Sequence, residues 1–406
     1  MRAAPALARA PSERARASGA ALGARANFAI VRSMSSPLPD AVPLGEVRRA
    51  LITKLRHHGD VLLASPVFTA LKRAAPHAEI DALVYGETAP MLAHHPAIAA
   101  LHTVDREWKR QGATRQAAGE WALVKALRQR RYDLLVHLTE HPRGLTLAHL
   151  LRPRYAVTRE REGHAPAWRH AFTHFYKVPA HTPRHTVETN LDALRRIGVY
   201  PDAGDRKLVL VPGATAEASV DAMLAQHGLT ATPFVQAHPG SRWLFKCWPP
   251  ERMAALLDHV AERGFAIAVT GAPDVREREI VMATIAACAE STRASIADLS
   301  GRLTLAELGA VTARARAFVG VDSAPMHIAA AMGTPALALF GPSSEHVWGP
   351  WQVAHRVVTS DLHPCRPCNL DGCGGGKVSE CLTTLPVDRA VAAFDALLHQ
   401  TESGAR

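Results

Sequence analysis

Long apolar runs are missing from this sequence. No uninterrupted apolar stretch reaches the roughly 20 residues that a membrane-spanning helix needs. The apolar stretches that do occur are short and are broken by Gly, Pro or charged residues. Such runs are typical of buried strands. The sequence therefore predicts a protein that does not span a membrane.

Aromatic residues are also scarce, at 5% of the 406 residues, although the formal net charge is +10. A basic protein favours anionic partners, such as nucleic acid, an acidic membrane surface or a phosphorylated substrate. Nucleic-acid binding usually needs a basic stripe within a recognisable module, whereas the Arg residues here are scattered through predicted helices. We therefore expect no nucleic acid among the partners.

Acidic residues are nearly absent from the first 45 residues, where only Glu13 and Asp40 occur. This Ala-, Arg-, Ser- and Pro-rich stretch has the composition of a disordered tail, and it also mimics an organelle transit peptide. Met34 is an alternative start, because the periodic pattern begins only at Val47. We interpret residues 1–45 as a disordered or mis-started extension outside the fold.

From Arg49 onward, short apolar runs alternate with longer amphipathic stretches, which is typical of a parallel sheet covered by helices. In the first half we predict strands at Ala50–Lys54, Ile80–Val84 and Leu134–Leu138, and helices running to Arg73, near Trp121–Arg130 and over Thr186–Ile197. The last of these helices should end at Gly198, a residue suited to helix termination. His141 to Pro183 is interpreted as long loops with short helices.

Residues Pro201 to Arg206 have the character of a linker, and the alternation restarts after them. Strands are predicted at Phe234–Ala237, Phe265–Thr270, Ala317–Val321 and Pro335–Phe340, and helices at Pro250–Arg263, from about Asp274, at Leu305–Arg314 and at Pro325–Met332. We therefore predict an α/β fold of two Rossmann-like βα domains, residues 46–203 and 204–400, that face a cleft. Ligands in open α/β sheets bind at the carboxyl ends of the strands.

The loop Arg56–Asp60 follows the first predicted strand. Gly59 permits a tight turn, so that Asp60 lies in the first turn of a helix. Asp commonly caps helices, so this carboxylate is either a cap or a functional group facing the cleft. His57 and His58 are expected to face solvent, where they could bind an anionic acceptor or tune the carboxylate.

A second loop, between His238 and Pro249, turns on Pro-Gly and presents Ser241 and Lys246 before the next helix. A hydroxyl and a Lys in such a turn suit a diphosphate. The alternative is an ordinary surface loop.

In a third segment, a strand delivers Asp322 and Ser323 to the start of a helix, with Pro325 near its first turn. The free N–H groups and the dipole of a helix start form an anion site. Asp-Ser is also a plain N-cap, which leaves a structural explanation open.

Cysteine is rare, and four of the six cysteines gather in the Gly-rich segment 365–381, at Cys365, Cys368, Cys373 and Cys381. The opening C-x2-C spacing can bind zinc, although the four residues do not form two equal knuckles. A cytosolic enzyme would keep these thiols reduced. A structural metal, free thiols and a loop-ordering role stay open, and no catalytic metal is expected.

Taken together, these segments resemble family 9 glycosyltransferases, the ADP-heptose:lipopolysaccharide heptosyltransferases of Gram-negative bacteria. The similarity runs from about Arg49 to Leu398. The segment Ile52–Leu63, with its His-His-Gly-Asp, is especially similar to the heptosyltransferase III branch, and the Val-Asp-Ser-Ala-Pro-Met-His block and the Cys-rich tail agree with that branch. The resemblance implies GT-B architecture, with an N-terminal acceptor-binding domain and a C-terminal nucleotide-sugar-binding domain.

The resemblance also implies an inverting transfer of L-glycero-D-manno-heptose from ADP-heptose to a heptose hydroxyl of the lipopolysaccharide inner core. It makes Asp60 the general base. The implied donor-binding residues are Ser241, Lys246, Asp274, Asp322, Ser323, Ala324 and His327, and Arg143 is an implied acceptor-side contact. From their place in the loop before Asp60, Arg56, His57 and His58 are further candidate acceptor-binding residues. Lys246 and the helix start at Ser323 can meet the diphosphate charge, so that no metal or other cofactor is required.

The implied acceptor is anionic and lipid-anchored, so a basic enzyme should work peripherally at the cytoplasmic face of the inner membrane. Three other functions remain to be compared with this one. They are a family 9 enzyme with a different acceptor or nucleotide heptose, a GT-B-shaped sugar-nucleotide epimerase, and a basic zinc-containing nucleic-acid-binding protein.

Overall fold

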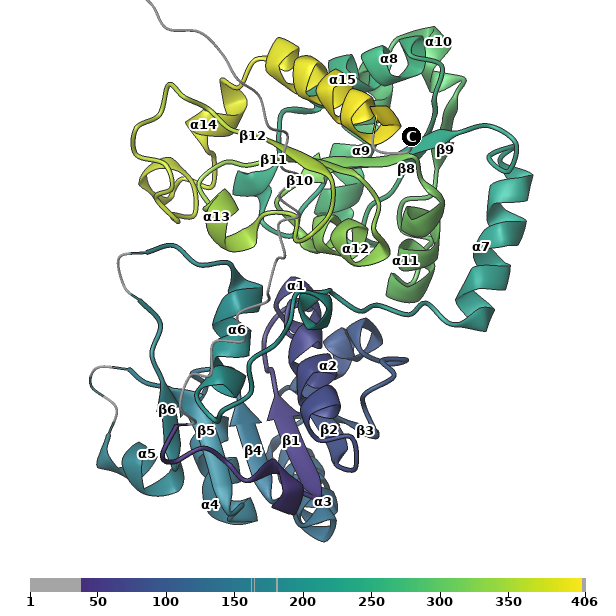
Figure 1. Ribbon diagram of the computed structural model, residues 1–406. Coiled ribbons are helices and arrows are strands. Elements are labelled where there is room, and N and C mark those ends of the chain that lie inside the picture. Colours follow the sequence, from purple (N-terminus) through teal and green to yellow (C-terminus); the bar gives the residue numbers. More distant parts are fainter. Residues whose placement is uncertain (1–37, 162, 164, 180–181, 404–406) are drawn as a thin grey trace, which may run out of the picture. The chain divides into compact units, whose positions relative to one another are not determined.

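The computed structural model describes residues 38–161, 163, 165–179 and 182–403 (Figure 1). This part of the chain contains two six-stranded sheets in which all pairings are parallel. The first sheet consists of β1 (Arg49–Thr53), β2 (Glu79–Tyr85), β3 (Ala100–Val104), β4 (Leu134–His137), β5 (Tyr155–Arg159) and β6 (His174–Tyr176). The second consists of β7 (Phe234–His238), β8 (Ala266–Val269), β9 (Ile296–Asp298), β10 (Ala317–Val321), β11 (Ala336–Leu339) and β12 (His355–Val358).

Both sheets have the same strand order. The first runs β3-β2-β1-β4-β5-β6, and the second runs β12-β11-β10-β7-β8-β9, which is the same order numbered from β7 and read from the other end. In such a sheet the connections reverse direction between its first and fourth strands, and ligands bind beyond the carboxyl ends there. The loops after β1 and β4, and those after β7 and β10, therefore mark the places where a ligand is expected.

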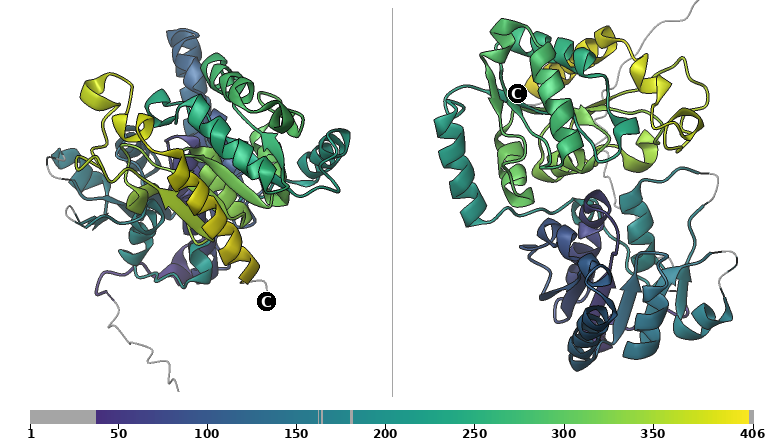
Figure 2. Two further views of the ribbon diagram at one scale, coloured as in Figure 1. Left: turned by 90° about the horizontal axis from the view of Figure 1, so that it is seen from above. Right: turned by 180° about the vertical axis from the view of Figure 1, so that it is seen from behind.

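In the first domain, helices cover both faces of the sheet (Figures 1 and 2). One face packs against α1 (His58–Leu62), α2 (Ser65–Ala74) and α6 (Thr186–Arg195), and the other packs against α3 (Ala113–Arg130), α4 (Arg143–Leu151) and α5 (Pro166–Ala171). Successive residues of β1 point to opposite faces, so Ile52 joins the first core and Leu51 the second. Because both faces are covered, the strand reads as a continuous apolar run.

The second domain repeats this layering. One face of its sheet packs against α8 (Pro250–Glu262), α9 (Val275–Ala287) and α15 (Val387–Ser403), and the other packs against α7 (Ala214–Gln226), α11 (Leu305–Arg314) and α12 (Ala324–Met332). Shorter helices are α10 (Glu290–Arg293), α13 (Glu345–Trp348) and α14 (Glu380–Thr383). The 3-10 turns are η1 (Leu44–Glu46), η2 (Gly86–Met91), η3 (Arg106–Lys109), η4 (Gly204–Arg206), η5 (Leu244–Lys246) and η6 (Cys373–Gly375).

Ile328 of α12 also joins the core around α1 and α2, so the apolar interior continues from one domain into the other.

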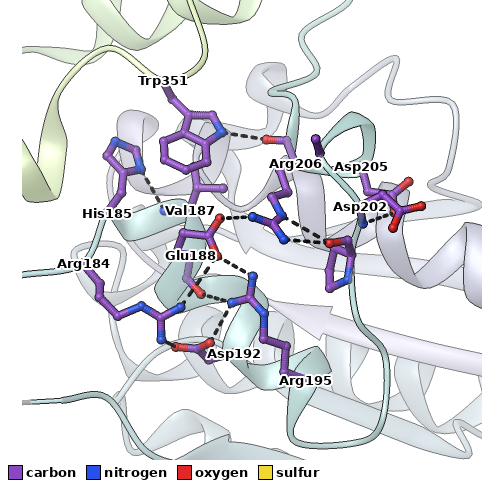
Figure 3. Close-up of polar contacts among 12 residues, drawn as sticks. Arg184, His185, Val187, Glu188, Asp192, Arg195, Asp202, Asp205, Arg206 and Trp351 are labelled. Carbon is purple, nitrogen blue, oxygen red and sulfur yellow. Dashed lines mark hydrogen bonds and ion pairs between the residues drawn. The ribbon is translucent and has the colours of Figure 1, made fainter. Parts of the chain in front are cut away.

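A charged network ties the segment between the domains to its neighbours (Figure 3). Glu188 of α6 accepts hydrogen bonds from Arg195 and, at 3.2 Å, from Arg206 of η4. The backbone carbonyl of Arg206 accepts a hydrogen bond of 2.7 Å from the indole N–H of Trp351. The Trp351 ring stacks on the His185 ring, with the two ring centroids 4.4 Å apart. Since these charges are partly buried and paired, breaking one partner leaves another uncompensated.

The predicted α/β class with two Rossmann-like βα domains is confirmed. The predicted strands appear to within one or two residues, but the long helix to Arg73 is wrong: it breaks between α1 and α2, just before Pro66. A proline at that position fits only a helix's first turn. Residues 141–183 contain the expected short helices, α4 and α5, but their interpretation as otherwise loops is wrong, because β5 and β6 also lie there.

The domain limits at residues 46–203 and 204–400 stay predictions. Of the predicted N-terminal extension, residues 1–37 lie outside the described residues. From Leu38 the chain follows the first domain: Val42 is buried, and its backbone N–H donates to the Ile197 carbonyl at 3.1 Å. Among the helices of the described chain, none combines the length and the apolar character needed to cross a membrane.

Candidate active site

Asp60 lies in the first turn of α1, directly beyond the carboxyl end of β1. The N-cap position of this helix is His57, and no side chain caps it. Asp60 is half-buried, and within the described part of the chain its carboxylate has no hydrogen-bond or ion-pair partner. A capping role therefore does not account for this residue, and its oxygens are free to accept a proton.

A buried amine supports the Asp60 loop from below. Lys54 Nζ donates to the Leu138 carbonyl at 3.2 Å and to Asn190 Oδ1 at 3.0 Å. Burial lowers the pKa of Lys54 to about 8, while the nearby Asp60 carboxylate acts in the opposite direction. Asn190 in turn donates to the Leu63 carbonyl at 3.0 Å. The ends of β1 and β4 are thus linked to α6 and to the turn after α1.

The two histidines before Asp60 are half-buried, whereas we predicted that they face solvent. His58 Nε2 lies 2.9 Å from the Glu87 carbonyl. His57 Nδ1 lies 3.3 Å from an Arg242 guanidinium nitrogen, and its ring meets Trp243 edge-on. Burial lowers the pKa of both histidines. His57 therefore forms part of the contact with the loop after β7.

On the opposite side of the site, a buried carboxylate holds Lys246. Asp322 is 4% exposed and follows β10. Its Oδ2 accepts from Lys246 Nζ at 2.6 Å and also from the Ser343 hydroxyl, which comes from the loop after β11. Three separate loops thus converge on one carboxylate. The arrangement fixes the Lys246 ammonium beside the start of α12.

Helix α12 begins with Ala324 directly after Ser323, which occupies the N-cap position without a side-chain cap bond. The first N–H groups of this helix therefore keep their capacity to bind an anion. His327 lies one turn further along, is 3% exposed, and has a buried Nδ1 without a partner among the described residues. Burial lowers the pKa of His327 to about 4, so the ring is neutral at physiological pH.

The two halves of the site meet where α1 packs against α12. A Cβ atom on Gly59 would lie 2.8 Å from His327 Cδ2, too close for any side chain. Glycine therefore lets the two helices approach. As a result, the helix that carries Asp60 lies directly against the helix whose start faces the predicted diphosphate position.

Two further predicted donor residues occupy distinct positions. Ser241 is buried, and its hydroxyl accepts from the Trp243 N–H at 3.3 Å, which shapes the turn before Lys246. Asp274 is exposed and caps α9, where it accepts from the Arg276 N–H at 3.0 Å. The buried acid at this edge is instead Glu277, which lies 3.6 Å from His238 and was not predicted.

The predicted acceptor residues are less closely grouped. Arg56 is exposed at the loop before α1. Arg143 begins α4, beyond the carboxyl end of β4, and forms a two-pronged ion pair with Glu120 of α3. Its guanidinium is therefore already neutralised in this structure. The acceptor roles of these arginines and of the two histidines stay predictions.

The sequence of this chain also matches known proteins. A family model described as glycosyltransferase family 9 (heptosyltransferase) matches residues 120–378. The chain is 33% identical over 298 residues to lipopolysaccharide heptosyltransferase 3 of Escherichia coli, covering 73% of this chain and 84% of that protein. A protein of the same name from Escherichia coli strain K12 is 32% identical over 351 residues, covering 85% and 96%. The chain belongs to glycosyltransferase family 9.

Structural comparison agrees with this assignment. A family 9 glycosyltransferase from Veillonella parvula superposes with a TM-score of 0.75 at 23% identity, covering 89% of this chain and 99% of that one. The predicted GT-B architecture and the predicted family are thereby confirmed, as is glycosyltransferase activity as the class of enzyme. The zinc-containing nucleic-acid-binding alternative does not fit a family 9 enzyme.

The cysteine-rich segment of this family 9 enzyme packs on the loops after β7 and β11. Arg366 donates to the Gly341 carbonyl at 2.6 Å, and Ser379 donates to the Phe245 carbonyl at 2.6 Å. All six cysteines are free thiols, and the described residues include no cluster of three or more His, Cys, Asp or Glu side chains placed to hold a metal ion. The observed contacts support the loop-ordering role, since they hold the turns that carry Ser343 and Lys246.

Four polar residues at the candidate site were not predicted from the sequence: Lys54, Asn190, Glu277 and Ser343. A lysine at the end of an otherwise apolar strand was a usable signal for Lys54, because a buried charge needs a partner. The others lie in ordinary helix or loop sequence, and only the fold brings them to their partners.

Proposed function

We propose that this family 9 enzyme transfers L-glycero-D-manno-heptose from ADP-heptose to a heptose hydroxyl of the lipopolysaccharide inner core, with inversion at the anomeric carbon. The likeness to two proteins named lipopolysaccharide heptosyltransferase 3 supports the donor and the acceptor. The single observation that supports the site is the packing of α1 on α12, which brings the free Asp60 carboxylate and an uncapped helix start together.

In this proposal the acceptor hydroxyl attacks the anomeric carbon while its proton passes to Asp60. The bond between that carbon and the diphosphate oxygen breaks, and ADP leaves. General base catalysis typically contributes about 10²–10⁴ in rate, so the leaving group must be stabilised as well. Lys246 and the N–H groups at Ser323 and Ala324 meet the developing phosphate charge. Asp322 positions Lys246, and no cofactor is needed.

Lys54 acts on this step through Asp60. Its buried ammonium is fixed by the Leu138 carbonyl and by Asn190 of α6. Asn190 also donates to the Leu63 carbonyl, directly after the helix that carries Asp60. Lys54 is therefore a positioning residue that holds the loop of the proposed base against β4 and α6.

The acceptor side is proposed to lie at the carboxyl edge of the first sheet, around Arg56, His57, His58 and Arg143. An anionic sugar phosphate there would compete with Glu120 for Arg143, since guanidinium binds both groups in the same two-pronged way. We further propose that the enzyme works at the cytoplasmic face of the inner membrane, where a lipid-anchored acceptor is available.

The substitution Asp60→Asn tests the proposed base. Asn keeps the size of the side chain and removes the basicity, so the variant should fold, bind ADP-heptose and lose on the order of 10²-fold or more in kcat. The assay is single-turnover transfer to core-truncated lipopolysaccharide, read by mass spectrometry, with a thermal melt and a donor titration on the same preparation. Near-normal transfer by folded protein would remove Asp60 from the chemistry. If the enzyme epimerises the heptose of ADP-heptose in the absence of an acceptor, the proposed transfer is wrong and the protein is a sugar-nucleotide epimerase.

A further inference from the structure

One surface of the first domain has no role in the site described above. Helix α3 exposes Trp121, whose side chain has an exposed fraction of 70%. The other exposed tryptophan of the described residues, Trp243, is 41% exposed. Around it lies a shallow pocket of about 460 Å³ lined by Trp121, Val124, Lys125, Arg128, Gln129 and Arg131. Tryptophan is enriched at interfaces and in membrane-interface belts, where one end of the side chain is apolar and the other is wet.

The cations of this surface have no internal partners. Lys125, Arg128 and Arg131 are exposed and form no ion pair with any residue of the described chain. The acids near α3, in contrast, have other partners: Glu120 pairs with Arg143, Glu79 and Asp81 pair with Arg130, and Asp133 accepts from the backbone N–H groups of Arg48 and Arg49. The surface therefore carries an uncompensated positive charge around one indole ring.

We infer that this face of α3, defined by Trp121, Lys125, Arg128 and Arg131, docks the enzyme on an anionic lipid bilayer. Tryptophan partitions to the headgroup region of a bilayer, and Lys or Arg beside it binds acidic headgroups while its aliphatic stem lies along the apolar boundary. A nucleic acid would meet this charge equally well, but a single indole without further exposed aromatic residues on α3 gives no stacking platform.

The position of α3 suits this role. Glu120, next to Trp121, reaches Arg143 at the carboxyl edge of the sheet, whereas Arg130 reaches Glu79 at the amino end of β2. The surface thus begins midway along α3, where Glu120 reaches toward the edge that carries the proposed acceptor residues, and it runs away from that edge toward the amino ends of the strands. A bilayer bound there would present lipid-anchored acceptors at that edge. This inference deepens the proposed membrane association and depends on it.

Vesicle flotation tests the inference without any transfer reaction. The full-length protein should float with vesicles of phosphatidylcholine mixed with phosphatidylglycerol and should stay behind with phosphatidylcholine alone. The variant Lys125→Glu/Arg128→Glu should bind the anionic vesicles on the order of 100-fold more weakly, because each basic side chain near such a surface contributes severalfold in affinity. The Trp121→Ser variant should bind the anionic vesicles roughly tenfold more weakly, since the substitution removes only apolar contact with the bilayer.

The matched control is Lys207→Glu/Arg302→Glu, which changes the net charge equally at two exposed residues that have no ion-pair partner in the described chain. It should bind vesicles like the unmodified enzyme. Equal loss in both double variants would reduce the effect to net charge and overturn the docking surface. Absence of binding to anionic vesicles would also overturn it and would leave a protein or nucleic acid as the partner of α3.

Transfer to a deacylated acceptor in solution separates this inference from the proposed function. The α3 variants should transfer heptose to that acceptor at the normal rate and should lose activity only on acceptor embedded in vesicles. If the unmodified enzyme binds vesicles through α3 but transfers no heptose, the proposed function fails while the docking surface stands.

Discussion

Replacing Gly59 by Ala adds one methyl group at the contact between α1 and α12. The new Cβ would lie 2.8 Å from His327 Cδ2, whereas ordinary contacts begin at 3.4 Å, so the two helices must separate by about 0.6 Å. His327 cannot yield, because it is 3% exposed and its neighbours Met326 and Ile328 are fully buried.

Two opposing effects decide the stability of Gly59→Ala. Alanine in a helix is favoured over glycine by about 1 kcal/mol, and overpacking a filled interior costs about 1–3 kcal/mol. We expect the cost of overpacking to exceed the gain in helix preference, so that the variant has a lower free energy of unfolding. The rate of heptose transfer should fall by more than this loss of stability alone would cause. Asp60 is the next residue and moves with the helix, and a displacement approaching 1 Å can cost about 10²-fold in rate.

The assay combines a thermal melt with single-turnover transfer at saturating donor. Gly204→Ala is the matched control, since a Cβ there has nothing within 4 Å, and it should leave both quantities unchanged. In a His327→Ala background the clash is gone, so adding Gly59→Ala should be neutral or stabilising. A Gly59→Ala variant that is more stable and fully active would refute the reasoning. Equal rate loss in both backgrounds would refute it too, because the methyl group would then not act through His327.

Three further outcomes are expected. Lys246→Ala should weaken ADP-heptose binding by roughly 10–100-fold, because a charge-assisted contact to phosphate is lost, and Lys246→Arg should rescue it only partly. Unchanged donor affinity in folded protein, measured by calorimetry, would exclude Lys246 from the donor site. Transfer should survive EDTA, and loss of turnover that magnesium alone restores would contradict the metal-free mechanism. Acid should destabilise the fold: His327 has a pKa of about 4 when folded and near 6.5 when unfolded. Its contribution of up to about 3 kcal/mol is therefore full above pH 6.5 and is lost as the pH falls to 4. Urea unfolding of His327→Gln should show a shallower decline of the free energy of unfolding over that range than the unmodified enzyme. An identical decline would assign the acid sensitivity to other groups, such as His137, whose pKa is lowered to about 3 by burial.

The sequence predicted the interior of the fold better than its margins. The strands predicted correctly include β1, β4, β7 and β10, which lie in the middle of their sheets and are apolar on both faces. The edge strands β3, β6, β9 and β12 were all missed. An edge strand is covered less completely, so polar residues interrupt its pattern, as in His174-Phe-Tyr176 or Ile296-Ala-Asp298. The strand order in the sheets could not be predicted either, because the order of strands along the sequence does not specify which strands pair.

The candidate site shows the same division. Asp60, Lys246 and Asp322 lie in short motifs, where a strand, a turn and a helix follow within a few residues, so local rules place them. Asn190 reaches Lys54 across 136 positions of the chain, and Ser343 meets Asp322 across 21. No local pattern encodes such pairs. Asp274 caps α9 in the structure, and its predicted donor role stays a prediction.

The direct packing of α1 on α12 determines which interior substitutions this enzyme can accept without losing activity. The proposed base and the proposed phosphate-binding turn are joined through a buried helix contact, so their separation is specified by interior volume. Substitutions beneath that contact, for example at Ile328 or Val61, would change the spacing by fractions of an ångström while leaving every chemical group in place. Such variants would keep their fold and their affinity for the donor, and the loss would appear first in the rate of transfer. Evolution of activity in this enzyme would accordingly be constrained by aliphatic residues that never touch a substrate.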